Sequence, residues 1–169
     1  MVDAVKRLLL VVDYQKDFVD GALGFPGAEA LDGPIAAKIA ACRAAGDDVA
    51  FTLDTHGPDY LDTQEGRKLP VPHCLLNSEG WQLYGQTGQA MERSRDMVIG
   101  KGAFPSLWLA NWLKEQGYDR VELAGLVSYL CVLSNAIMVK AALPEAVTAV
   151  EALELKNMLR QEADQMDCV

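Results

Sequence analysis

The chain has 169 residues, half of them apolar, which is about the length of one domain and enough to bury a core without disulfide support. Its formal net charge is -9 and its basic residues are scattered, which argues against a nucleic-acid-binding protein. The apolar run nearest the start, Leu8 to Val12, is too short for a membrane span or a signal segment. We therefore predict a single domain over residues 1–169, located in the cytoplasm, with neither nucleic acid nor a membrane as a partner.

The first part of the chain predicts two strands separated by a helix. Residues 5–12 form a continuous Leu/Val run, which is typical of a strand buried on both faces, and Asp13 follows its end. A segment that begins at Pro34 has apolar residues at helical spacing until Gly46, as in a crossover helix. Residues 48–53 then form a second short apolar strand. This order is the beginning of a parallel sheet.

The stretch 58–94 interrupts the pattern with turns, polar residues and isolated aromatics. It is long enough that we expect a functional loop there and not a plain connector. The strand pattern resumes at residues 97–100, and Lys101 follows this third strand.

The last part of the chain continues the alternation of helices and strands. We expect helices at 104–116, 130–142 and 153–166 and strands at 120–124 and 145–150. Such alternation predicts a doubly wound α/β fold, with a mainly parallel sheet of five or six strands and helices on both faces. In such sheets, ligands bind beyond the carboxyl ends of the strands.

Donor side chains for a metal ion follow the second strand. The chain has only two histidines, His56 and His73, and His56 stands two residues after Asp54. Together with Glu65, these residues supply the nitrogen and oxygen donors that zinc, iron or manganese accept. The alternative is that Asp54 caps a turn while both histidines are ordinary surface residues, and the spacing alone does not decide between the two.

Cys131 opens the apolar helix that follows the glycine-containing loop 125–128. At a helix N-terminus the dipole and the free amides favour the thiolate, and the same amides could stabilise an oxyanion. The alternative is that Cys131 is a small buried hydrophobe, which is a common role of a free cysteine. No Cys-x-x-Cys pair accompanies the pattern, which argues against a thiol redox protein.

Five motifs occur in the order that one enzyme family shows. They are Asp13-Tyr14-Gln15-Lys16-Asp17-Phe18, Asp54-Thr55-His56, Pro72-His73-Cys74, Lys101-Gly102-Ala103-Phe104 and Gly125-Leu126-Val127-Ser128-Tyr129-Leu130-Cys131-Val132. The first resembles the D-x-Q-x-D-F opening of the isochorismatase-like cysteine hydrolases. The whole set, over residues 8–150, is similar to the nicotinamidases within that family.

The resemblance implies a catalytic triad and a metal site. The triad would be Asp13, Lys101 and Cys131. The metal ligands would be Asp54, His56 and His73, with Glu65 where some nicotinamidases add another ligand. The ion would be one divalent metal, with zinc as first choice and iron or manganese as alternatives.

The resemblance also assigns the groups that hold the substrate. Main-chain amides of Val127 and Cys131 would form the oxyanion hole. Phe18, with Trp81 or Trp108, would flank the substrate ring. The reaction would convert a small carboxamide, nicotinamide, into nicotinate and ammonia through a thioester, as in NAD salvage, and the family commonly forms homo-oligomers.

The nucleophile loop departs from the family pattern G-V-A-T-D-x-C-V, because Val127 replaces a small residue and Tyr129 replaces an acid. Relatives carry a non-proline cis peptide at the bond that matches Leu126–Val127, so we expect one here. Two alternatives stay open. One is a metal-free family member that cleaves another small amide or carbamoyl compound, and the other is a catalytically weak binding protein on the same scaffold.

Overall fold

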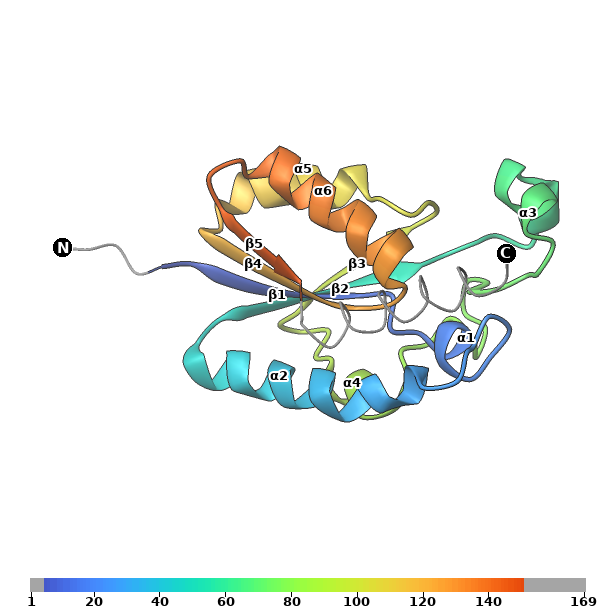
Figure 1. The fold of residues 1–169 in the computed structure, drawn as a ribbon, viewed down its shortest axis with the longest axis horizontal. Coiled ribbons are helices and arrows are strands. Elements are labelled where there is room, and N and C mark those ends of the chain that lie inside the picture. The colour runs from blue at the N-terminus through green and yellow to red at the C-terminus, as the bar shows by residue number, and fades with distance from the viewer. Residues whose placement is uncertain (1–4, 151–169) are drawn as a thin grey trace, which may run out of the picture.

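The structure, a computed structural model, describes residues 5–150. Within this range the chain forms a five-stranded sheet in which every strand runs parallel to its neighbours (Figure 1). The strands are β1 (Arg7–Val12), β2 (Asp48–Asp54), β3 (Met97–Lys101), β4 (Arg120–Gly125) and β5 (Val147–Val150). They lie in the order β3-β2-β1-β4-β5, so the predicted parallel α/β sheet is confirmed with five strands.

Helices cover both faces of the sheet. The longer helix α2 (Asp32–Ala45) and the short α4 (Gly85–Ala90) lie on one face, and α5 (Leu107–Gln116) and α6 (Leu133–Ala142) lie on the other (Figure 1). Side chains of β1 alternate between two apolar clusters, because successive residues of a strand point to opposite faces. The central strand is therefore apolar along its length, as its continuous Leu/Val run predicts.

The helix ends differ slightly from the prediction. Helix α5 begins at Leu107, three residues later than expected, because the Ser106 hydroxyl accepts a hydrogen bond from the Leu109 amide and caps the helix. Helix α2 begins at Asp32, before Pro34, and ends as predicted at Gly46, whose φ of 81° is left-handed.

Several short elements escaped the prediction. The region from 58 to 94 is not wholly irregular, because it contains the 3-10 turn η2 (Tyr60–Asp62) and the helices α3 (Gln64–Lys68) and α4. Helix α1 (Lys16–Val19) and the turn η1 (Ala28–Leu31) lie between β1 and α2. These elements have one or two turns, too few to produce a recognisable periodicity.

The predicted helix at 130–142 is divided in two. Its first part belongs to a π-helical turn, η3 (Ser128–Val132), and α6 begins only at Leu133. The predicted helix at 153–166 lies outside the described residues. Between residues 5 and 150, no helix is both long and apolar enough to cross a membrane.

Candidate active site

A lysine, two carboxylates and a thiol converge at the carboxyl edge of the sheet. Lys101 Nζ lies 2.5 Å from Asp13 Oδ2, 3.4 Å from Asp54 Oδ1 and 3.6 Å from Cys131 Sγ. All four residues are buried. The sheet register explains the meeting, because Asp54 pairs with Lys101 across β2 and β3 while Asp13 follows the neighbouring strand β1. The predicted triad is therefore assembled in space.

The backbone at Asp13 turns its carboxylate into this cluster. Its φ is 47°, in the left-handed region that few residues other than glycine adopt. The Thr52 hydroxyl donates to Asp13 Oδ1 at 2.7 Å. Burial raises the pKa of Asp13, and the Lys101 ammonium opposes that rise. Although burial disfavours the ammonium of Lys101, the surrounding negative groups raise its pKa and keep it protonated.

Cys131 lies in the π-helical turn η3, and not at the N-terminus of an α-helix as predicted. Burial and the neighbouring Asp13 raise the pKa of the thiol, and the Lys101 ammonium only partly counteracts them. The expectation that the helix end favours the thiolate is therefore not confirmed. The resting thiol is protonated, and a base is needed to activate it.

Asp54, His56 and His73 form the predicted donor cluster. Their nearest ligand atoms all lie within 4.8 Å of one another, and all three residues are buried. Asp54 Oδ2 lies 3.0 Å from His56 Nε2 and 3.4 Å from His73 Nε2. Although burial raises the pKa of Asp54, the neighbouring histidines and the Lys101 ammonium outweigh burial and hold that pKa well below its usual range. The donors include two imidazole nitrogens and a carboxylate, a set that suits a divalent metal.

Two further contacts complete this cluster. His73 Nδ1 lies 2.8 Å from the Val71 carbonyl oxygen, which can only accept, so Nδ1 carries the proton and Nε2 is left to face the cluster. Glu65, from α3, places Oε1 3.9 Å from the Nε2 atom of each histidine. Glu65 is therefore a neighbour of the cluster and not one of its three central donors.

Gln15 holds the backbone of Asp54 in place. Its side-chain oxygen accepts from the Asp54 amide at 2.7 Å, and its side-chain nitrogen donates to the Asp54 carbonyl at 2.9 Å. The same nitrogen donates to the Trp81 carbonyl at 2.8 Å. Gln15 is fully buried, and its side-chain amide continues the hydrogen-bonded ladder with β2 beyond the end of β1. Sequence reasoning placed Gln15 in a motif but assigned it no role.

Asp17 fastens the loop that carries His73. Its Oδ2 atom accepts from the Cys74 amide at 2.7 Å, and the Cys74 carbonyl accepts from the His56 amide at 3.0 Å. The two histidine-bearing segments are thus joined through the backbone of Cys74, whose φ of 45° is left-handed. Asp17 is only partly buried, and sequence reasoning placed it, like Gln15, in a motif without assigning it a positioning role.

Aromatic rings surround the histidines. Phe18 is buried, with its ring centroid 5.6 Å from that of His73, so the predicted substrate-flanking residue lies beside the cluster. Tyr60, which sequence reasoning missed, lies 4.7 Å from His56 and 5.0 Å from His73 by ring centroids. The Trp81 indole donates to the Thr55 hydroxyl. Trp108 is 53% exposed on α5, a position that does not support its predicted role beside the substrate ring.

The nucleophile loop has the expected family conformation. The Leu126–Val127 peptide bond is cis, as predicted, despite the bulkier Val127. Gly125 has a φ of 137°, and a Cβ atom there would lie 1.9 Å from the Val12 carbonyl oxygen, so only glycine fits. The buried Asn135 side chain donates to the Cys131 carbonyl at 2.8 Å and ties the turn to α6.

The fold and the site define the class of protein: an α/β enzyme with a cysteine, a carboxylate and a lysine buried together at the carboxyl edge of a parallel sheet. The chain matches the isochorismatase domain over residues 7–142, and it belongs to the isochorismatase family. It is 27% identical over 146 residues to the nicotinamidase/pyrazinamidase of Mycobacterium tuberculosis, covering 77% of this chain and 76% of that protein.

Solved structures agree with this family. The nicotinamidase/pyrazinamidase PncA from Bacillus subtilis has a TM-score of 0.75 at 26% identity, with 87% of this chain and 84% of that chain covered. The N-carbamoylsarcosine amidase from Thermoplasma acidophilum has a TM-score of 0.73 at 27% identity, with 86% and 81% covered. The family and these relatives indicate a hydrolase that acts on an amide carbon–nitrogen bond.

Proposed function

We propose that this protein is a metal-assisted cysteine amidohydrolase that converts nicotinamide into nicotinate and ammonia through a thioester. The observation that carries the proposal is the convergence of Cys131, Asp13 and Lys101 beside the Asp54, His56 and His73 cluster. Hydrolysis of an amide needs an activated nucleophile, a proton carrier and a stabilised oxyanion. The site has side chains for the first two of these roles.

Overall similarity does not select the substrate. The chain is equally identical, at 27%, to the nicotinamidase of Mycobacterium tuberculosis and to the N-carbamoylsarcosine amidase of Thermoplasma acidophilum. The donor cluster is the feature that favours a pyridine carboxamide. A divalent ion held by Asp54, His56 and His73, zinc by preference and iron or manganese as alternatives, would supply an acceptor for the ring nitrogen.

The triad residues carry out the chemistry in two stages. In the first, Asp13 takes the Cys131 proton, the sulfur attacks the carboxamide carbon, and Asp13 passes the proton to the nitrogen as the carbon–nitrogen bond breaks and ammonia leaves. In the second, Asp13 takes a proton from water, whose oxygen attacks the thioester carbon. The carbon–sulfur bond then breaks, Asp13 returns its proton to the sulfur and restores the thiol, and the acid product leaves as nicotinate after releasing its proton to solvent.

The surrounding groups support these steps. The Lys101 ammonium, 2.5 Å from Asp13 and 3.6 Å from the sulfur, stabilises the negative charge that moves between the two. Main-chain amides of Val127 and Cys131 would hold the oxyanion. Phe18, beside His73, would pack against the substrate ring and keep its carboxamide directed at the thiol.

The test is ammonia release from nicotinamide by the purified protein, measured with and without a chelator. We expect release that falls when the metal is removed and returns when zinc is added. Release from an N-carbamoyl compound with no chelator effect would instead support a metal-free hydrolase, the alternative favoured by the likeness to N-carbamoylsarcosine amidase. No release from any amide, with Cys131 no more reactive than Cys42, would support a binding protein.

Assembly and location stay predictions. We expect a homo-oligomer, because members of the family commonly assemble, and a cytoplasmic protein. Light scattering coupled to size-exclusion chromatography would measure the number of chains per particle.

A further inference from the structure

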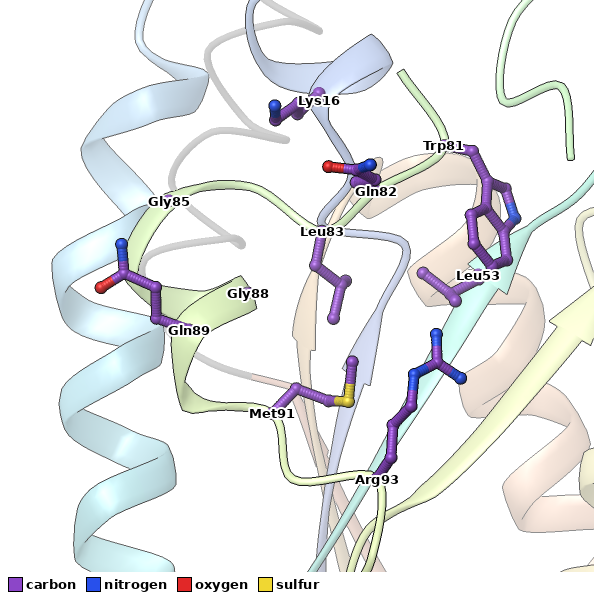
Figure 2. Close-up of a pocket in the computed structure, with 10 residues that line it drawn as sticks. All are labelled: Lys16, Leu53, Trp81, Gln82, Leu83, Gly85, Gly88, Gln89, Met91 and Arg93. Carbon is purple, nitrogen blue, oxygen red and sulfur yellow. The ribbon is translucent and has the colours of Figure 1, made fainter. Parts of the chain in front are cut away.

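A hollow lies near the candidate active site, between the segment that carries α4 and the end of β2. Its volume is about 470 Å³, within the range of small-molecule sites. Figure 2 shows its lining, with Leu53 from β2, Trp81 and Leu83 from the segment before α4, and Met91 and Arg93 after it. Leu53 directly precedes Asp54, yet no member of the triad or of the donor cluster lines this hollow.

One side of the hollow is apolar. Its apolar lining comes from Leu53, Trp81, Leu83 and Met91. Figure 2 shows the Leu83 and Met91 side chains directed toward each other. The Trp81 indole is held by its hydrogen bond to the Thr55 hydroxyl at 2.9 Å, which fixes a flat surface at one end. A flat apolar group of a ligand could pack on this surface.

The charge of the hollow is opposite to that of the chain. The net charge is -9, yet no Asp or Glu occurs among the ten described residues that line the hollow, while Lys16 and Arg93 do. Lys16 is paired with Glu79 at 2.9 Å. Between residues 5 and 150 no acidic group pairs with Arg93, whose neighbour Glu92 instead contacts Arg43 at 3.2 Å. The Arg93 guanidinium points toward Leu53 (Figure 2).

We propose that this hollow is a second binding site, which takes a small organic anion with a flat apolar body. Arg93 would bind the carboxylate through two parallel hydrogen bonds, the arrangement that guanidinium groups favour. The apolar body would lie against Trp81, Leu53 and Met91. This site does not depend on the proposed function, because none of its residues belongs to the triad or the donor cluster.

The site shares one wall with the candidate active site. The Trp81 carbonyl accepts from the same Gln15 nitrogen that donates to the Asp54 carbonyl, and the Trp81 indole donates to Thr55, the residue after Asp54. A ligand in the hollow would thus touch Trp81, which is hydrogen-bonded to Thr55 and to the Gln15 side chain that holds Asp54. This contact also makes Trp81 a fluorescent reporter of the site.

The experiment is a titration of the intact protein with benzoate, followed by tryptophan fluorescence. Benzyl alcohol, which has the same ring but no charge, serves as the ligand control. Arg93→Gln removes the cation, and Arg95→Gln removes an exposed arginine two residues away that does not line this hollow. We expect saturable binding of benzoate to the wild type and to Arg95→Gln, and a dissociation constant about tenfold higher in Arg93→Gln, since the lost bonds are charge-assisted.

The outcomes separate this site from the catalytic one. Equal dissociation constants in the wild type and Arg93→Gln, or no saturable signal from the wild type, would overturn the proposal. Equal binding of benzyl alcohol would overturn the anion assignment. Amidase activity measured on the same samples is expected to be unchanged in Arg93→Gln without benzoate. A protein that binds benzoate through Arg93 but does not hydrolyse nicotinamide would refute only the proposed function.

Discussion

Two groups of side chains meet at the candidate active site, and the chain positions them differently. Asp13, Asp54 and Lys101 stand at strand ends, where the hydrogen-bonded register of the sheet sets their spacing. His73 and Glu65 come from the region 58–94, where no strand of the sheet holds them. Their positions depend instead on local contacts.

The contacts that hold the loop group come largely from one segment. Residues 14–17 form main-chain hydrogen bonds with residues 80–84, and the Gln15 and Asp17 side chains hold Asp54 and Cys74. The strand-end group is therefore secured by the sheet, with Gln15 as an additional support at Asp54, and the loop that carries His73 is held through the Asp17 side chain. Changes to those polar residues should affect the donor cluster more than the triad.

The largest expected effect is on the triad of Asp13, Lys101 and Cys131. Cys131→Ala should lower the rate of ammonia release at least about a thousandfold, since the nucleophile itself is lost. The fold should persist, because the change removes one small buried atom. Circular dichroism would check the fold, and Cys42→Ala is the matched control. An active Cys131→Ala variant would end the nucleophile assignment.

The next effect distinguishes the donor cluster from the triad. His56→Ala and His73→Ala should each lose the bound metal, because each removes one of three central donors. Metal analysis by mass spectrometry after dialysis measures this loss. The rate at which a thiol reagent labels Cys131 should stay close to that of the wild type. Wild-type metal content in both variants would show that the cluster holds no ion.

A smaller effect tests the hydrogen bonds between the Gln15 side chain and the Asp54 backbone. Gln15→Met should weaken metal binding by about 10- to 100-fold, because such supporting contacts orient the ligands. Competition with a chromogenic chelator would give the dissociation constant. Gln82→Met, at an exposed position in the paired segment, is the control. If Gln15→Met bound metal as tightly as the control, the sheet alone would be sufficient to position Asp54.

The smallest effect concerns Glu65. Glu65→Gln should weaken metal binding by less than about tenfold, because Glu65 is partly exposed and 3.9 Å from each histidine nitrogen. The same chelator competition measures it. A complete loss of metal would make Glu65 a fourth ligand and give α3 a larger part in the site.

The strands could be predicted from the sequence because each is a short apolar run that ends in a polar residue. All five predicted strands overlap the observed ones, and Asp13, Asp54 and Lys101 follow or end them as expected. The donor cluster was also predicted, although the assignment of roles to its members came from the family resemblance. That the chain is a single domain stays a prediction.

The parts that were missed lie where the periodicity is short or the contacts are distant in sequence. Helices α1, α3 and α4 have too few turns to show a pattern, and the π-helical turn at Cys131 interrupts an otherwise helical apolar run. The contacts of Gln15 with Asp54 and Trp81 join residues 39 and 66 positions apart. Tyr60 offered no signal beyond an isolated aromatic in a polar stretch.

The sequence by itself determined that a parallel sheet forms and that polar residues gather at its carboxyl edge, because apolar run lengths and polar strand ends are local properties of the chain. Only the tertiary structure decided which residues of the region 58–94 reach that edge and how the thiol is protonated. Both depend on burial and on hydrogen bonds between distant segments, and neither can be obtained from the spacing of residues along the chain.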